Sequence, residues 1–128
     1  GTMETVRGML EGRFFNESTS PEVRKKVLDT MLSCPPEVGA GMLDEGGVFV
    51  QRMGDLLRKA DEKPFMAIWS ASPLGNPERL REATRFLRQE PIAESGHFFQ
   101  LEQPEITTAG LRAFLEEAAR DPRVGQGT

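Results

Sequence analysis

The chain has 128 residues, 38% of them hydrophobic, and a formal net charge of -4. This length and composition are typical of one globular domain with a real core, not of a disordered chain. Sixteen lysines and arginines face twenty aspartates and glutamates, so no basic excess supports nucleic-acid binding. No apolar run approaches the roughly 20 residues that span a bilayer, and the N-terminus lacks signal-peptide character, so we expect a cytoplasmic protein without membrane contact.

The chain divides near Lys63-Pro64, where the sequence pattern changes. We expect a helical segment over residues 3–62 and an α/β unit over residues 63–122. Residues 1–2 and 123–128 are interpreted as tails or cloning scars, because Gly-Thr occurs at both ends. One cysteine and one histidine exclude an internal disulfide and a zinc site built from such residues, so we expect no metal and no cofactor.

The first half shows helix signals in chain order. Ser20-Pro21-Glu22 marks a helix start, with Ser20 as N-cap and proline at the first helical position. This helix should end before Cys34-Pro35-Pro36. A second short helix is expected from Pro36 to Leu43, stopped by Gly46-Gly47. A third helix should place four apolar residues at helical spacing: Phe49, Met53, Leu56 and Leu57.

The second half alternates strand and helix signals. Residues 64–70, PFMAIWS, form a short apolar run typical of a strand buried on both faces of a parallel sheet. Asn76-Pro77 should start a helix, and residues 91–94 give a weaker strand. The helix that starts at Asn76-Pro77 is expected to turn four residues inward: Leu80, Ala83, Phe86 and Leu87. A closing amphipathic helix is expected to carry Leu111, Phe114, Leu115, Ala118 and Ala119. The order predicts an α/β fold with two parallel strands and covering helices.

One stretch resembles a known family. Ser95-Gly96-His97-Phe98 is followed by Leu101-Glu102-Gln103-Pro104-Glu105 and by a helix that ends Ala113-Phe114-Leu115. Together with the strand after Pro64, this order resembles the C-terminal part of the α/β-hydrolase superfamily over residues 64–115, and the helical segment before it resembles the end of the cap. The resemblance implies a truncated α/β-hydrolase fold and a catalytic role for His97 as general base, since imidazole titrates near neutral pH.

The family's other catalytic groups are not evident in the sequence. No G-x-S-x-G elbow occurs, and Ser70 and Ser72 lack the flanking glycines. Cys34 is interpreted as a structural apolar residue. Asn76 is read as an N-cap, and Glu102 as a carboxylate that braces the local loop.

Two functions therefore stay open. The chain is expected to be part of an ester- or amide-type hydrolase that is inactive alone, with its nucleophile supplied from sequence outside it. Alternatively, it is a non-catalytic interaction module derived from the same fold. The expected partner is a second copy of the chain or a complementary N-terminal hydrolase half, because a two-stranded sheet leaves apolar surface uncovered.

Overall fold

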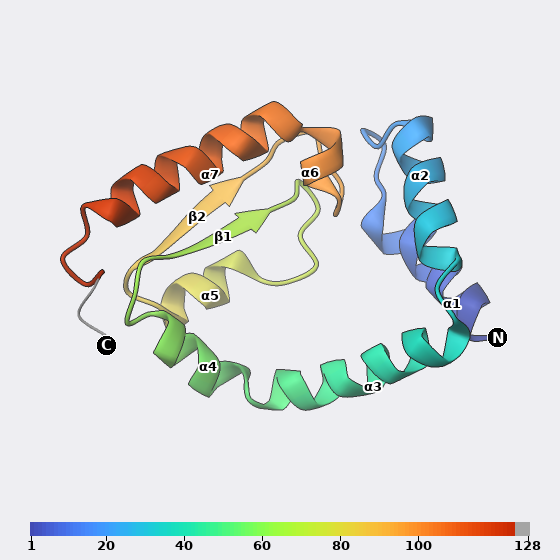
Figure 1. The fold of residues 1–128 in the computed structure, drawn as a ribbon, viewed down its shortest axis with the longest axis horizontal. Coiled ribbons are helices and arrows are strands. Elements are labelled where there is room, and N and C mark those ends of the chain that lie inside the picture. The colour runs from blue at the N-terminus through green and yellow to red at the C-terminus, as the bar shows by residue number, and fades with distance from the viewer. Residues whose placement is uncertain (125–128) are drawn as a thin grey trace.

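A computed structural model describes residues 1–124, so the end of the expected C-terminal tail, residues 125–128, lies outside the described residues. The fold is mixed α/β with a two-stranded parallel sheet. Figure 1 shows α1 and α2 on one side of a ring-like arrangement and the sheet unit on the other, with α3 and α4 joining them. The helices are α1 (Thr2–Met9), a π-helix (Leu10–Phe14), α2 (Pro21–Leu32), α3 (Pro36–Gln51), α4 (Met53–Ala60), α5 (Pro77–Ala83), α6 (Phe99–Glu102) and α7 (Pro104–Ala119).

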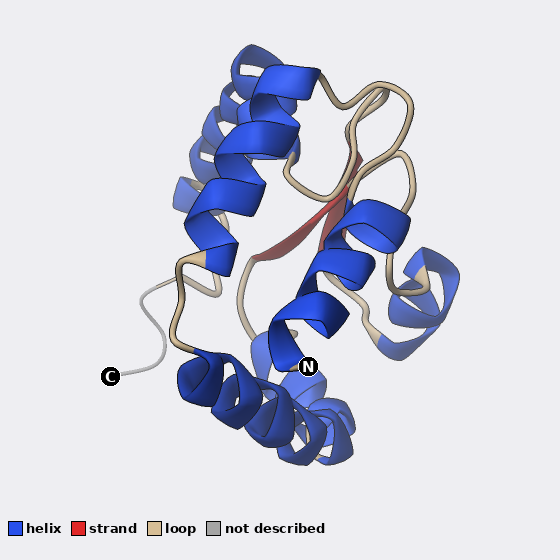
Figure 2. Cartoon of the chain, turned by 90° about the vertical axis from the view of Figure 1, so that its right-hand side faces the viewer, coloured by secondary structure: helices blue, strands red, loops and turns tan. Residues whose placement is uncertain are grey.

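The sheet consists of β1 (Phe65–Trp69) and β2 (Leu87–Pro91), which pair in parallel with Phe65 opposite Leu87. The two strands lie among helices that make up most of the described chain (Figure 2). Successive side chains of a strand point to opposite faces. Gln89 donates through Nε2 to the Pro77 carbonyl of α5 at 2.9 Å, whereas Glu90 packs against Gly110 of α7. Helices α5 and α7 therefore cover opposite faces of the sheet.

Two helix starts follow their local sequence signals as predicted. Ser20 caps α2, since its side chain accepts a hydrogen bond from the Val23 N–H at 3.2 Å. Asn76 caps α5, where its Oδ1 accepts from the Arg79 N–H at 3.0 Å. In both helices a proline occupies the first turn, where its missing N–H has no helical partner to lose. α2 also ends at Leu32, before the cysteine and two prolines, as expected.

Helix α3 contradicts the expected stop at Gly46-Gly47. It runs from Pro36 to Gln51 through both glycines. Its C-cap is Arg52, whose φ of -97° and ψ of 0° interrupt the helical backbone before α4. A glycine inside a helix costs roughly 1 kcal/mol relative to alanine but does not by itself prevent the backbone hydrogen bonds. The glycines therefore weaken one continuous helix and do not separate two.

The second strand also differs from its prediction. It is Leu87–Pro91, not residues 91–94, and the preceding helix ends at Ala83, so Phe86 and Leu87 are not inward residues of that helix. β2 reads LRQEP, and its polar side chains find partners instead of apolar neighbours. Gln89 Oε1, for example, accepts from Trp69 Nε1 at 2.6 Å. A strand stabilised by such pairs carries no hydrophobic signal in the sequence.

The burial of the α/β unit is lower than expected. All five residues of β1 are half-buried, so the expectation of a strand buried on both faces is wrong for the described chain. On α7 the buried positions are Thr107 and Gly110, while Leu111 and Leu115 are exposed. Gly110 faces the sheet because an added Cβ there would lie 3.2 Å from Glu90 Cγ, a close approach that an apolar side chain would prevent.

The main apolar cluster lies in the first half of the chain. Its buried members are Leu10, Phe15 and Val27, and the half-buried residues packed against it include Phe98. Phe98 belongs to the loop after β2, so this cluster joins the first helices to the α/β unit. Outside the cluster, Ile92 is the further buried hydrophobic residue among those described.

Candidate functional site

His97 lies in the loop between β2 and α6. The Ile92 N–H donates to the Trp69 carbonyl at 2.8 Å, and the Ala71 N–H donates to the Ser95 carbonyl at 3.2 Å. These two bonds hold the segments that leave β1 and β2 side by side. The carboxyl ends of parallel strands are the edge at which α/β folds gather functional groups. The structure thus places the histidine loop at this edge.

A segment from the other end of the sequence docks on this loop. We call residues 14–19 the docking segment. The His97 N–H donates to the Phe14 carbonyl at 2.8 Å, and Asn16 Nδ2 donates to the Ser95 carbonyl at 2.6 Å. The two bonds hold the backbone on both sides of Gly96, so the docking segment fixes the path of the loop.

Gly96 permits the close approach of the docking segment. A Cβ at this position would lie 2.6 Å from the Phe14 carbonyl oxygen and 2.8 Å from Thr19 Oγ1. It would also lie 3.1 Å from Glu102 Oε2, the atom that accepts the Gly96 N–H at 2.9 Å. Any side chain at Gly96 would therefore push the docking segment away from the loop.

The His97 ring lies between two aromatic side chains while the residue remains solvent-exposed. It stacks on Phe14, with ring centroids 4.3 Å apart and an interplanar angle of 26°. Phe98 meets the histidine ring edge-on, with centroids 5.2 Å apart. Partial burial removes water from the imidazole and lowers the pKa of His97 below its ordinary value of 6.5. The neutral ring, the form that accepts a proton, is thereby favoured near pH 7.

Glu102 has the bracing role that the sequence predicted. It lies at the end of α6, and its Oε2 accepts the Gly96 N–H. Its Oε1 is buried and has no hydrogen-bond partner among the residues that the structure describes. Glu102 therefore supports the backbone of the histidine loop.

The remaining candidates lie apart from one another. Ser70 is buried, whereas Ser72 is exposed. Cys34 is half-buried at the end of α2, where its Sγ contacts the Pro35 carbonyl at 3.7 Å. Neither serine is followed by the helix start that a nucleophile elbow requires. Among the described residues, neither these serines nor Cys34 is evident as a nucleophile beside His97.

Sequence reasoning missed the docking segment. Asn16 carries a local turn signal, since its Oδ1 accepts from the Ser18 N–H at 3.0 Å, which is an Asx turn. That signal indicates a turn but not the contact with Ser95, which joins residues 79 positions apart. Arg24 of α2 supports the turn by donating to the Asn16 and Thr19 carbonyls at 2.5 and 3.1 Å. A long-range contact of this kind leaves no periodic pattern in the sequence.

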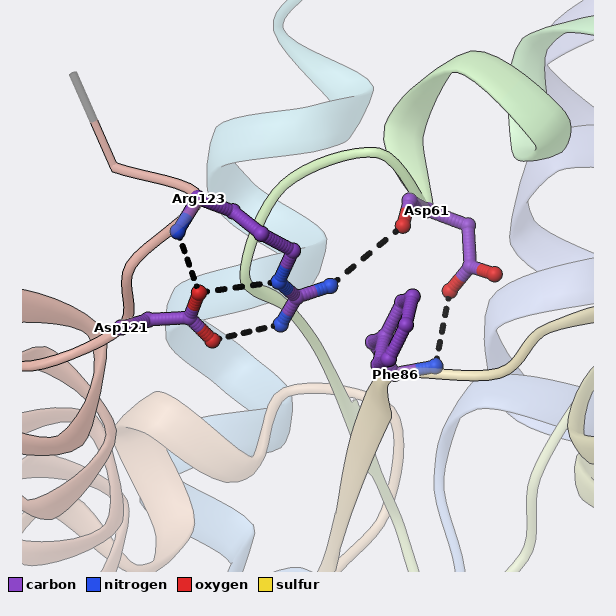
Figure 3. A network of polar contacts seen from close by, with 4 residues as sticks. All are labelled: Asp61, Phe86, Asp121 and Arg123. Atoms are coloured by element: carbon purple, nitrogen blue, oxygen red, sulfur yellow. Dashed lines mark hydrogen bonds and ion pairs between the residues drawn. The ribbon is translucent and has the colours of Figure 1, made fainter. Parts of the chain in front are cut away.

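A second polar cluster lies at the opposite edge of the sheet, where the strands begin (Figure 3). Asp61 accepts hydrogen bonds from the backbone N–H groups of Arg85 and Phe86 at 2.7 and 3.0 Å. Arg123 lies over the Phe86 ring at 3.9 Å and pairs with Asp121 at 2.6 Å. The contacts of Arg123 with the Asp61 carbonyl and the Phe86 ring join the segment after α7 to the end of α4 and to the residue before β2.

No helix within residues 1–124 has the length and apolar character that crossing a bilayer requires. The same part of the chain contains no cluster of histidine, cysteine, aspartate and glutamate side chains suited to a metal ion. Comparison of the chain with family models, with curated proteins and with solved structures finds no match.

Proposed function

We propose that the chain is the C-terminal portion of an α/β-hydrolase in which His97 acts as general base on an ester, amide or related bond. The parallel pair β1 and β2, with α5 and α7 on opposite faces, supports this fold. The observation that carries the proposal is the placement of His97. The His97 N–H donates to the Phe14 carbonyl, which fixes the backbone. His97 is solvent-exposed at the end of the sheet where the strands reach their carboxyl ends.

In this proposal His97 takes the proton of a nucleophile and returns it to the leaving group. The nucleophile comes from sequence outside this chain, and so does the acid that would orient the imidazole. The lowered pKa of His97, caused by partial burial, favours the neutral ring, which is the form that accepts a proton. Glu102 and the docking segment hold the loop in place.

A non-catalytic interaction module is the second candidate. It is favoured by apolar surface on α3, where Val38, Met42 and Phe49 follow one stripe of the helix and are 49%, 71% and 53% exposed. Among the described residues, no ion pair reaches the His97 ring, and desolvation is the one cause of its lowered pKa. A hydrolase-derived module without catalytic activity would have an apolar surface for a partner and a histidine without a charged partner.

The test compares the chain alone with the longest reading frame that contains it, using p-nitrophenyl butyrate as substrate. The chain alone should give no burst of p-nitrophenol and no covalent adduct on Ser70, Ser72 or Cys34, since a base without a nucleophile forms no acyl-enzyme. The longer protein, or the chain mixed with a complementary N-terminal half, should turn over the ester and react with a fluorophosphonate probe.

His97→Ala is the control in both preparations. Activity of the longer protein should fall by at least about a hundredfold, the lower range for a general base. Turnover that survives His97→Ala unchanged would contradict the role of His97. A reading frame that supplies no nucleophile would favour the interaction module.

A further inference from the structure

We propose that the docking segment orients the His97 ring, with Phe14 and Asn16 as positioning residues, so that a segment of the helical first half of the chain sets the geometry of the candidate base. The inference rests on the proposed function for its consequence in catalysis. Its geometric basis is independent of any activity, because it concerns contacts between residues 14–19 and the loop over residues 95–97.

The docking segment contacts three consecutive residues of the histidine loop. Asn16 Nδ2 donates to the Ser95 carbonyl at 2.6 Å. Gly96 lies so close that an added Cβ would be 2.6 Å from the Phe14 carbonyl oxygen. That oxygen accepts the His97 N–H at 2.8 Å. The loop backbone therefore cannot move without breaking contacts with the docking segment.

The His97 ring packs against two aromatic side chains. Phe14 stacks on the imidazole at 4.3 Å between centroids, and Phe98 lies edge-on to both rings. Two aromatic neighbours restrict rotation of the His97 side chain and keep water from one face of it. The same backbone that presents the Phe14 ring also accepts the His97 N–H. Phe14 thus couples the position of the loop to the orientation of the ring.

The charged groups around the contact come from several elements. Arg24 of α2 donates to the Asn16 and Thr19 carbonyls, and Glu102 of α6 accepts the Gly96 N–H. Arg13 and Glu17 flank Phe14 and Asn16 and are exposed. The lowered pKa of His97 has desolvation as its cause, without a charged partner among the described residues. Titration of the ring therefore reports how closely Phe14 covers it.

The experiment is an NMR titration of the imidazole Cε1–H, which needs no assignment because the chain has one histidine. Phe14→Ala should raise the titration midpoint toward the ordinary value and remove the ring-current shift of the proton. Phe14→Leu should act less strongly, since it keeps apolar cover without the ring. Phe14→Tyr keeps the aromatic face, so His97 should titrate with the same midpoint as in the original chain.

Asn16→Ala is the decisive variant, because it leaves Phe14 intact. It removes the bond to Ser95 together with the Asx turn to Ser18, both of which hold the docking segment, and should raise the midpoint in the same direction as Phe14→Ala. Glu17→Gln, an exposed neighbour in the same segment, is the matched control. Removing its negative charge favours the neutral imidazole, so this change should not raise the midpoint.

Far-UV circular dichroism and the fluorescence of Trp69 verify that each variant is folded. The proposal is overturned if folded Asn16→Ala and Phe14→Ala titrate as the original chain does. It is equally overturned if Phe14→Tyr or Glu17→Gln raises the midpoint as much as Asn16→Ala, since that would be general loosening. The titration is measured without substrate, so failure of the hydrolase proposal leaves its result unaffected.

Discussion

Replacing Gly96 by alanine tests the close contact on which the site depends. The added Cβ would lie 2.6 Å from the Phe14 carbonyl oxygen and 2.8 Å from Thr19 Oγ1, closer than such atoms can approach. Overpacking of this kind costs about 1–3 kcal/mol. The chain can relieve the clash if the docking segment withdraws. It then loses the bonds of Phe14 to His97 and of Asn16 to Ser95, about 1 kcal/mol each, and the aromatic contacts of Phe14, about 0.5–1.5 kcal/mol.

Overpacking thus costs about 1–3 kcal/mol in the free energy of unfolding, and withdrawal of the docking segment about 2.5–3.5 kcal/mol. With an m-value of about 2 kcal/mol/M in urea, the unfolding midpoint should fall by about 0.5–1.5 M. The assay is urea unfolding followed by far-UV circular dichroism. Gly8→Ala is the matched control, because nothing lies within 4 Å of a Cβ there and Gly8 is inside α1. It should raise stability by about 0.5–1 kcal/mol.

If Gly96→Ala unfolds at the same urea concentration as the original chain, the docking segment does not contact Gly96 in solution, which would refute the prediction. Loss of stability in Gly96→Ala together with an equal loss in Gly8→Ala would point to a general sensitivity to alanine and would also contradict the argument.

Three further predictions follow from other contacts. Glu94 has a φ of 52°, so Glu94→Gly should relieve left-handed backbone strain and raise the free energy of unfolding by about 0.5–1 kcal/mol; a loss in thermal melting would contradict this. The side-chain hydrogen bond from Arg123 lowers the pKa of Asp121 from 3.8 to about 2. The stabilisation from this carboxylate is therefore fully present above pH 3.8 and is lost as the pH falls through about 2. When the free energy of unfolding is measured against pH, Asp121→Asn should lack this loss. Among the described strands, β1 pairs only with β2, so the backbone N–H and C=O groups along its other side have no strand partner. Such an unpaired strand favours association with another chain, and we expect a homodimer. Light scattering coupled to size exclusion across a dilution series would contradict the dimer by showing a monomer that unfolds cooperatively at micromolar concentration.

Local signals in the sequence determined several elements correctly. The caps at Ser20 and Asn76 and the strand after Pro64 all follow from residues within one or two turns of the boundary. Such signals suffice because a cap bonds to the backbone three residues away, and a short apolar run between turn residues favours a strand. The order of strand, helix, strand and helix followed from the same signals, although the exact bounds of the second strand did not.

Tertiary structure alone decided the features that depend on distant partners. β2 is a strand because Gln89 pairs with Trp69 and Glu90 lies against Gly110, contacts that no sequence period encodes. The docking segment reaches the histidine loop through a bond between residues 79 positions apart. The sequence singled out His97 by its motif, but its stacked ring and fixed backbone arise from Phe14. The local sequence therefore identifies a candidate residue, whereas the environment of that residue depends on which segment folds against it.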